Sequence, residues 1–147
     1  MPLVIDASVA LAWCFEDEAT PETEAVLDLV GKETAVVPPI WELEMANVLL
    51  GAEKRGRLSE FQTARFVSLL GQLPIMIDSA PSDIKSVIAA GRRHGLTSYD
   101  ATYILLAERE GLELATLDAA LIAAAETAGI PLTIQRGQGE QQGADHP

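Results

Sequence analysis

The sequence is poor in cysteine, in aromatic residues and in long apolar runs. Its 147 residues include the single Cys14, and aromatic residues make up 5%. One cysteine cannot form an internal disulfide, which is typical of proteins from a reducing compartment. The apolar run Leu3–Ile5 is interrupted at Asp6 and lacks the basic segment of a secretory signal, and no run reaches the roughly 20 residues that span a bilayer. We therefore expect a cytoplasmic protein without a membrane segment.

Basic residues are also scarce. Lys and Arg number 10 against 22 Asp and Glu, which gives a net charge of -12. A general nucleic-acid-binding protein usually presents a basic face, so this charge argues against that class. An acidic chain also suits a partner with basic segments. Two groups stand out among the basic residues, namely Lys54, Arg55 and Arg57, then Arg92, Arg93 and His94.

Apolar residues, in contrast, make up 48% of the chain and recur in short runs between helical patterns. The expected strands lie at LVID, TAVVPP, PIMID, LELATLD and PLTI. Because these runs show no alternation with polar residues, they favour a parallel sheet with both faces covered. We predict one α/β domain over residues 1–134 with about five parallel strands, and a disordered polar tail over 135–147. For one helix the limits are readable, with Thr20 as N-cap, Pro21 in the first turn and a stop at Gly31.

Acidic residues follow the predicted strands or lie early in the helices. Asp6 comes directly after the first strand, and Asp118 follows the LELAT strand by one residue. Asp100 lies in the first turn of a helix that starts near Thr97, and Glu42 or Glu44 lies early in the helix after the second strand. The carboxyl ends of parallel strands share one edge of a sheet, where ligands bind. These acids can therefore converge on one rim.

Each acid on its own also has a structural interpretation. Asp6 and Asp118 can cap the helices that follow them, and Thr97 with Asp100 has the spacing of a capping box. Convergence changes this balance, because several carboxylates close together repel one another and need a counter-ion. Oxygen ligands alone suit Mg²⁺ or Mn²⁺ rather than Zn²⁺. Such an ion also binds phosphate and activates water.

Four motifs carry a resemblance to a known family. They are VIDASV, PPIWELEMANVL, LTSYDATYILLAE and LATLDAAL, and the resemblance that they carry covers Leu3 to about Ile134. The sequence resembles a PIN domain, and more closely a VapC-type toxin of a type II toxin–antitoxin pair. The resemblance implies a three-layer α/β/α sandwich around a parallel sheet. It also implies a Mg²⁺- or Mn²⁺-dependent endoribonuclease, usually a homodimer, that a cognate VapB-type antitoxin neutralises.

The resemblance assigns roles to individual residues. Asp6 and Asp100 match the acids on which metal binding centres in the family, and Glu44 and Asp118 would complete the site directly or through water. Glu44 is preferred to Glu42 because the family register has an Asn three residues on and a Leu five residues on, as in EMANVL.

Further positions support the site or face the substrate in this reading. Two hydroxyl residues match positions that commonly support the acids by hydrogen bonds, namely Ser8 and Thr116. The candidate phosphate contacts are Lys54, Arg55, Arg57, Arg92 and Arg93. Their alternative role is a favourable charge near the carboxyl end of a helix.

Two other functions stay open at this point. A metal-dependent phosphomonoester hydrolase of the haloacid-dehalogenase type also begins with an Asp after the first strand, but it needs a second acid two residues on, where this chain has Ser8. A partner-binding module with little intrinsic activity is the second alternative. The apolar helices Trp41–Leu50 and Phe61–Leu73 can present a surface for a partner helix, or they can belong to the core.

Overall fold

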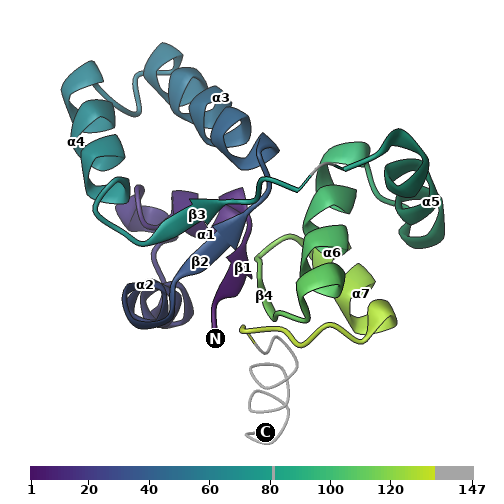
Figure 1. Ribbon diagram of the computed structural model, residues 1–147. Coiled ribbons are helices and arrows are strands. Elements are labelled where there is room, and N and C mark those ends of the chain that lie inside the picture. Colours follow the sequence, from purple (N-terminus) through teal and green to yellow (C-terminus); the bar gives the residue numbers. More distant parts are fainter. Residues whose placement is uncertain (81, 135–147) are drawn as a thin grey trace, which may run out of the picture.

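The computed structural model describes residues 1–80 and 82–134, and Figure 1 shows their arrangement. The polar tail expected over residues 135–147 lies outside the described residues. The elements are β1 (Leu3–Ile5), α1 (Ala7–Ala12), the 3-10 helix η1 (Glu16–Glu18), α2 (Pro21–Glu33), β2 (Ala35–Val37), α3 (Ile40–Lys54), α4 (Glu60–Leu70), β3 (Ile75–Ile77), α5 (Ile84–His94), α6 (Ser98–Glu110), β4 (Leu114–Ala115) and α7 (Ala119–Ala128).

The described strands form one parallel sheet in the order β3-β2-β1-β4. β1 pairs with β2 through Leu3 and Ala35, and with β4 through Val4 and Leu114. The described part of the chain therefore has four strands rather than about five. The expected last strand is reduced to one parallel bridge between Leu114 and Leu132. The prediction of a parallel sheet is confirmed, and the difference in strand number is small.

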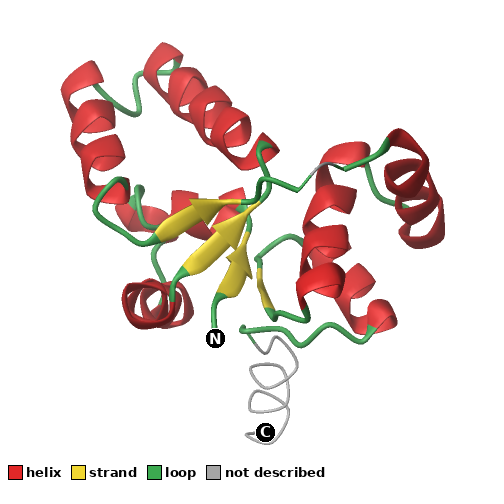
Figure 2. Ribbon diagram, in the orientation of Figure 1, coloured by secondary structure: helices red, strands yellow, loops and turns green. Residues whose placement is uncertain are grey.

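Helices cover both faces of this sheet. In Figures 1 and 2, α1 to α4 lie on one side and α5 to α7 on the other. α1 packs against α2 and α3, while α6 packs against α5, α7 and β1. The two layers follow from the strand order, because right-handed crossovers place helices on opposite faces once the direction of winding reverses after β3. The fold is thus the expected three-layer α/β/α sandwich.

Local signals explain where several helices begin and end. Thr20 and Thr23 form a capping box at the start of α2, and Pro21 occupies its first turn. The predicted stop at Gly31 is wrong, because α2 continues to Glu33 and ends at Thr34, whose φ is 77°. A glycine inside a helix costs only about 1 kcal/mol, which the packing of the rest of α2 offsets.

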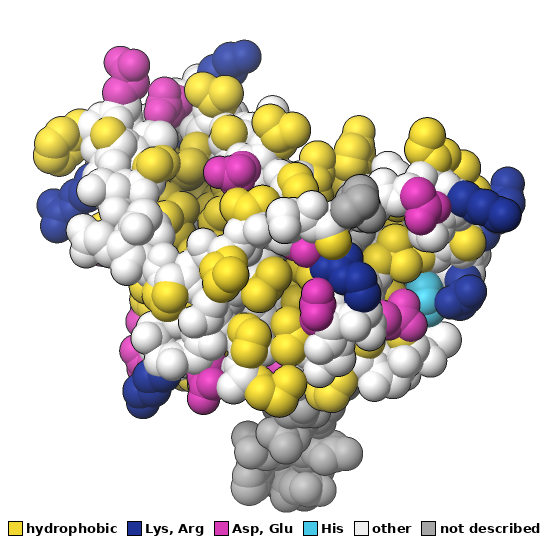
Figure 3. All heavy atoms as spheres, in the orientation of Figure 1, with side chains coloured by type: hydrophobic (Ala, Val, Ile, Leu, Met, Phe, Trp, Pro, Cys, Tyr) yellow, Lys and Arg dark blue, Asp and Glu magenta, His cyan; other side chains and the backbone are white. Residues whose placement is uncertain are grey.

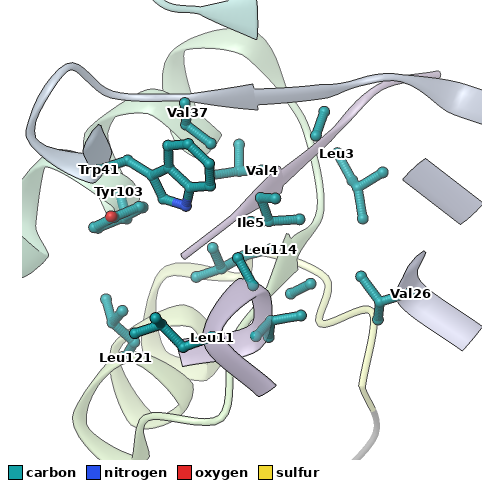
Figure 4. Packing of buried hydrophobic residues seen from close by; sticks show 14 of the residues in the cluster. Leu3, Val4, Ile5, Leu11, Val26, Val37, Trp41, Tyr103, Leu114 and Leu121 are labelled. Atoms are coloured by element: carbon teal, nitrogen blue, oxygen red, sulfur yellow. The ribbon is translucent and has the colours of Figure 1, made fainter. Parts of the chain in front are cut away.

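The core forms around β1, whose three residues are all buried. Figure 4 shows Leu11 and Val26 from one helical layer and Leu121 from the other, packed around Ile5 and Leu114. Full burial of such a side chain stabilises the fold by about 1.5–3 kcal/mol. This packing fixes the ends of β1 and β4, where the candidate site lies. Within the described ranges, no helix combines the length and the apolar character needed to cross a membrane.

Candidate functional site

The site lies where the winding of the sheet changes direction. β2 flanks β1 on one side and β4 flanks it on the other. After β1 the chain enters α1 in one helical layer, and after β4 it enters α7 in the other. In open α/β sheets, ligands bind at such a point, outside the carboxyl ends of the strands. Asp6 follows β1 directly, and Thr116 and Asp118 follow β4.

Asp6 is held at this edge by three donors. The residue is 4% exposed. Its Oδ1 accepts hydrogen bonds from the Ser8 hydroxyl at 2.7 Å and from the Val9 amide at 3.2 Å. Its Oδ2 accepts one from the Thr116 hydroxyl at 2.6 Å. The bond from Val9 makes Asp6 the N-cap of α1, so the structural interpretation is correct for this residue. The two hydroxyl bonds go beyond a cap, because they fix the plane of the carboxylate.

The two hydroxyls also tie Asp6 to the loop after β4. The Ser8 oxygen accepts a hydrogen bond from the Leu117 amide at 3.0 Å, and the Thr116 oxygen accepts one from the Asp118 amide at 3.0 Å. Each hydroxyl therefore donates to Asp6 and accepts from the backbone of the neighbouring turn. This arrangement joins two segments that are more than 100 residues apart. It agrees with the supporting role expected for Ser8 and Thr116.

Asp118 and Asp100 enter the site from helix N-termini. Asp118 Oδ2 accepts the Leu121 amide at 3.0 Å and caps α7. Thr97 caps α6 by accepting the Asp100 amide at 3.1 Å. The reciprocal half of the capping box is missing, since the Asp100 carboxylate accepts no hydrogen bond from any group in the described ranges. The Asp100 carboxylate is therefore available for a ligand, and the positive end of the α6 dipole favours its charge.

The two glutamates of α3 point in different directions. Glu42 is exposed, whereas Glu44 is half-buried. Glu44 Oε1 accepts a hydrogen bond from the Tyr103 hydroxyl at 2.5 Å. Trp41, one turn before Glu44, is buried, so this face of α3 looks inward. Glu44, and not Glu42, is thus turned toward the interior, where it contacts Tyr103.

Burial and mutual repulsion disfavour the charges of these acids. Burial raises the pKa of Asp6 to about 6, and the charge of Asp118 adds to this rise. Hydrogen bonds from Ser8, Thr116 and Val9 act in the opposite direction, but the loss of solvent outweighs them. Burial also raises the pKa of Asp100, with further contributions from the charges of Asp118 and Glu44.

Burial and the charges of the acids also affect the hydroxyl of Tyr103. Burial raises the pKa of its hydroxyl, and the hydrogen bond to Glu44 raises it further. The charges of Glu44, Asp6 and Asp100 contribute in the same direction. All four acids are therefore linked electrostatically, either to one another or through Tyr103. The sequence interpretation missed Tyr103, although its position three residues after Asp100 on one helix places both on the same face.

The donor set fits a hard divalent cation that keeps much of its water. In residues 1–80 and 82–134, no basic side chain forms an ion pair with Asp6, Glu44, Asp100 or Asp118. No three His, Cys, Asp or Glu side chains of those ranges converge as a ready-made metal cage. Mg²⁺ does not require such a cage, because it commonly takes one or two carboxylates with waters and substrate phosphate. Uncompensated carboxylate oxygens match its preference for oxygen ligands.

The basic candidates differ in how far they are engaged. Arg57 contacts Asp17 at 3.1 Å and Glu18 at 3.6 Å, and its guanidinium lies 4.3 Å from the centre of the Phe15 ring. Arg57 thus has local partners. The other four candidates are exposed at or beside the carboxyl ends of α3 and α5, namely Lys54, Arg55, Arg92 and Arg93. Their position also matches the favourable interaction of cations with helix C-termini.

Comparison with known proteins defines the class to which this fold and site belong. The family model for the PIN domain matches residues 3–131. The chain therefore belongs to the PIN domain family. Within the family it is similar to Ribonuclease VapC3 of Pyrobaculum aerophilum, with 30% identity over 120 residues, covering 80% of this chain and 90% of that protein.

Solved structures share the fold at lower identity. The crystal structure of PAE2754 from Pyrobaculum aerophilum superposes with a TM-score of 0.69 at 24% identity and covers 90% of both chains. FitAcB from Neisseria gonorrhoeae gives a TM-score of 0.57 at 18% identity, covering 88% of this chain and 95% of that one. A toxin–antitoxin complex from Klebsiella pneumoniae gives 0.53 at 20% identity, covering 79% and 86%. These matches establish the shared fold.

Proposed function

We propose that this protein is a Mg²⁺- or Mn²⁺-dependent endoribonuclease that serves as the toxin of a VapBC-like type II toxin–antitoxin system. The observation that carries the proposal is the acidic centre at the ends of β1 and β4. There Asp6 is oriented by Ser8 and Thr116, and Asp100 offers a carboxylate without a hydrogen-bond donor. Membership of the PIN domain family and similarity to a named ribonuclease support the same conclusion.

The chain's own residues would bind and orient the reacting groups. Asp6 and Asp100 would hold the cation, and Glu44 and Asp118 would complete its surroundings directly or through water. When bound, a divalent cation neutralises charge on the scissile phosphate and makes a water molecule more acidic. Ser8 and Thr116 keep the Asp6 oxygens in a fixed plane, so no reorientation is needed when the phosphate arrives. The raised pKa of Asp6 and Asp100 means that a proton competes with the cation for these acids.

An acidic chain needs help to hold RNA. With a net charge of -12, most of its surface repels phosphate, so the cation and the few exposed basic side chains would provide the attraction. The candidates with free exposed groups are Lys54, Arg55, Arg92 and Arg93. The cytoplasmic location expected from the sequence stays a prediction.

A VapB-type antitoxin and a second copy of the chain are the proposed partners. Helices α3 and α4 each bury one face in the core and expose apolar side chains on the other. Figure 3 shows hydrophobic side chains spread over the visible face of these helices and of β3. The exposed ones include Leu43, Leu50, Phe61, Val67 and Leu69. Exposed apolar side chains of this kind suit a partner helix, and the acidic charge suits a partner with basic segments.

The decisive experiment measures cleavage of a labelled RNA by the purified chain, with Mg²⁺, Mn²⁺ or a chelator. We expect metal-dependent cleavage that falls more than about 100-fold in Asp6→Asn and in Asp100→Asn. Glu44→Gln should lower the rate much more than Glu42→Gln, which is the matched exposed control. Cleavage that persists with chelator, or in both aspartate variants, would contradict the proposal.

The same preparation distinguishes the partner-binding alternative. A chain that binds the product of a neighbouring small gene, yet cleaves no RNA with either metal, would act as a binding module. Turnover of a phosphomonoester in place of RNA would favour the third reading. The sequence fits a phosphomonoester hydrolase poorly, because Ser8 occupies the position where a second acid is needed. The Ser8 hydroxyl is already hydrogen-bonded to Asp6 and to the Leu117 amide.

A further inference from the structure

One buried hydroxyl contacts the acidic centre and has no role in the proposed reaction. Tyr103 is 1% exposed, and its phenolic O–H donates to Glu44 Oε1 at 2.5 Å. The two residues come from opposite helical layers, Glu44 from α3 and Tyr103 from α6. Figure 4 shows the Tyr103 ring beside Trp41, near the carboxyl end of β1. The contact therefore joins the two layers at the rim where Asp6 lies.

The helical spacing makes Tyr103 part of the site wall. Asp100 and Tyr103 are three residues apart on α6, so they lie on one face of that helix. Trp41 and Glu44 have the same spacing on α3. The Asp100 carboxylate and the Tyr103 hydroxyl consequently belong to one face of α6, and the hydroxyl contacts Glu44. One of them repels the glutamate and the other binds it.

Glu44 needs such a donor in order to stay at the rim. Its charge lies close enough to Asp100 to raise the pKa of that residue, and no basic side chain in the described ranges forms an ion pair with it. A flexible glutamate under this repulsion would turn outward, where solvent stabilises its charge. Among the described groups, the Tyr103 hydroxyl is the donor that opposes this.

We propose that Tyr103 is a positioning residue of the acidic centre: its hydroxyl holds the Glu44 carboxylate at the rim, so that this side chain needs little rearrangement when a divalent cation binds. This inference rests on the proposed metal-dependent function. The competing explanation is purely structural. In that case Glu44 only accepts the hydrogen bond that the buried Tyr103 hydroxyl needs, and Tyr103 belongs to the core. The two explanations differ in what they predict for metal affinity.

The test compares Mn²⁺ affinity, measured by electron paramagnetic resonance or calorimetry, in wild type and Tyr103→Phe. The variant keeps the ring and loses one oxygen. We expect affinity to fall about 10-fold, the lower end of what removing a group that orients a metal ligand usually causes. Tyr99→Phe is the matched control, since Tyr99 lies on the same helix and is 58% exposed. Urea unfolding of each variant reports whether the fold is kept.

A double-mutant cycle separates positioning from a general loss of packing. In a Glu44→Gln background, Tyr103→Phe should change Mn²⁺ affinity little further, because the group that it positions is already altered. Unchanged affinity in a folded Tyr103→Phe protein would overturn the inference. The same loss in both backgrounds would also overturn it. A wild type that binds no Mn²⁺ would instead refute the proposed function.

A second measurement keeps the inference testable if Tyr103→Phe does not fold. The chain has two tyrosines, Tyr99 and Tyr103, so 3-fluorotyrosine labelling of the full chain gives two fluorine resonances. Addition of Mg²⁺ should shift the Tyr103 resonance in wild type and leave it nearly unmoved in Glu44→Gln. The Tyr99 resonance should not move in either protein. A Tyr103 resonance that ignores saturating Mg²⁺ would overturn the positioning role.

Discussion

Thr116 donates its hydroxyl hydrogen to Oδ2 of Asp6 over 2.6 Å, across a separation of 110 residues in the chain. The same Thr116 oxygen accepts the amide hydrogen of Asp118 at 3.0 Å. One hydroxyl thus sets the direction of one acid and the backbone of another. The order of the strands makes this possible, because β1 and β4 are neighbours in the sheet. The acidic centre depends on the contact between these two strands as well as on its carboxylates.

The first prediction concerns Thr116→Val. The substitution keeps the shape of the side chain, removes the donor to Asp6 and leaves the Asp118 amide without its acceptor. We expect Mn²⁺ affinity to fall about 10-fold and the free energy of unfolding to fall by about 1–3 kcal/mol. Calorimetric titration and urea unfolding measure the two effects.

Thr63→Val is the control for that substitution. Thr63 donates to the Ser59 carbonyl within α4, so it also loses a hydroxyl bond, but it lies outside the acidic centre. We expect its Mn²⁺ affinity to match the wild type. Equal losses of affinity in the two variants would mean that Thr116 acts through general stability.

The second prediction is the pH dependence of stability without metal. Burial raises the pKa of Asp6 from 3.8 to about 6, so the folded chain binds this proton more tightly than the unfolded chain does. The resulting stabilisation is fully present below about pH 4 and is lost as the pH rises through about 6. The loss is about 3 kcal/mol, at 1.36 kcal/mol per pKa unit.

Urea unfolding in the presence of a chelator, from about pH 4 to about pH 7.5, measures this dependence. Asp6→Asn should flatten the profile of the free energy of unfolding against pH. The raised pKa of Asp100 acts in the same direction, so part of the slope should remain. Saturating Mg²⁺ should oppose the loss, because it binds the ionised acids. Parallel profiles for wild type and Asp6→Asn would contradict the role of Asp6.

Much of the fold and of the acidic rim could be predicted from the sequence. Short apolar runs without alternation indicated the parallel sheet, and the placement of Asp6 and Asp118 after strands indicated a shared edge. The choice between Glu42 and Glu44 did not follow from helical spacing. Neither the periodicity nor the composition of α3 shows which of its sides faces the interior of the protein. The hydrogen bond from Tyr103 shows which glutamate turns inward, and it joins residues 59 positions apart.

Other features could not be predicted because they depend on tertiary contacts. The last expected strand is only a bridge at Leu132. Its pairing depends on the length of its neighbour β4, which has 2 residues. The extension of α2 past Gly31 depends on packing that outweighs a weak local preference. The engagement of Arg57 with Asp17 and Phe15 requires segments 40 residues apart to meet.

The third prediction concerns the backbone at Thr34. Its φ of 77° lies in the region that favours glycine, and Thr34 is the only non-glycine residue in the described ranges with a positive φ. Branched side chains are strained there by about 1–3 kcal/mol. Thr34→Gly relieves the strain but gains freedom in the unfolded chain, so we expect a net rise of about 1 kcal/mol in the free energy of unfolding.

Thermal or urea unfolding measures the effect of Thr34→Gly. The matched control is Thr127→Gly, within the helical geometry of α7, where the same change should destabilise by up to about 1 kcal/mol. Opposite signs for the two variants are the expected result. A loss of stability in Thr34→Gly would mean that contacts of the threonine side chain outweigh its backbone strain.

The fourth prediction separates candidate RNA contacts from structural cations. Arg57 is engaged with Asp17, Glu18 and the Phe15 ring, whereas Arg92 and Arg93 are exposed in the last turn of α5. We expect Arg92→Ala with Arg93→Ala to weaken RNA binding and to flatten its dependence on salt by about one contact each. Arg57→Ala should instead lower the free energy of unfolding, by about 1 kcal/mol, because packing on Phe15 is lost.

Filter binding of an RNA to the cleavage-deficient Asp6→Asn protein, over a range of salt concentrations, measures these effects without turnover. The salt slope is the informative quantity, since each phosphate contact releases counter-ions regardless of the RNA sequence. An unchanged slope in the Arg92→Ala, Arg93→Ala protein would assign those arginines to the α5 C-terminus alone, where cations interact favourably with the helix dipole. In that case the divalent cation would carry most of the attraction for phosphate, and RNA affinity should then depend steeply on Mg²⁺ concentration.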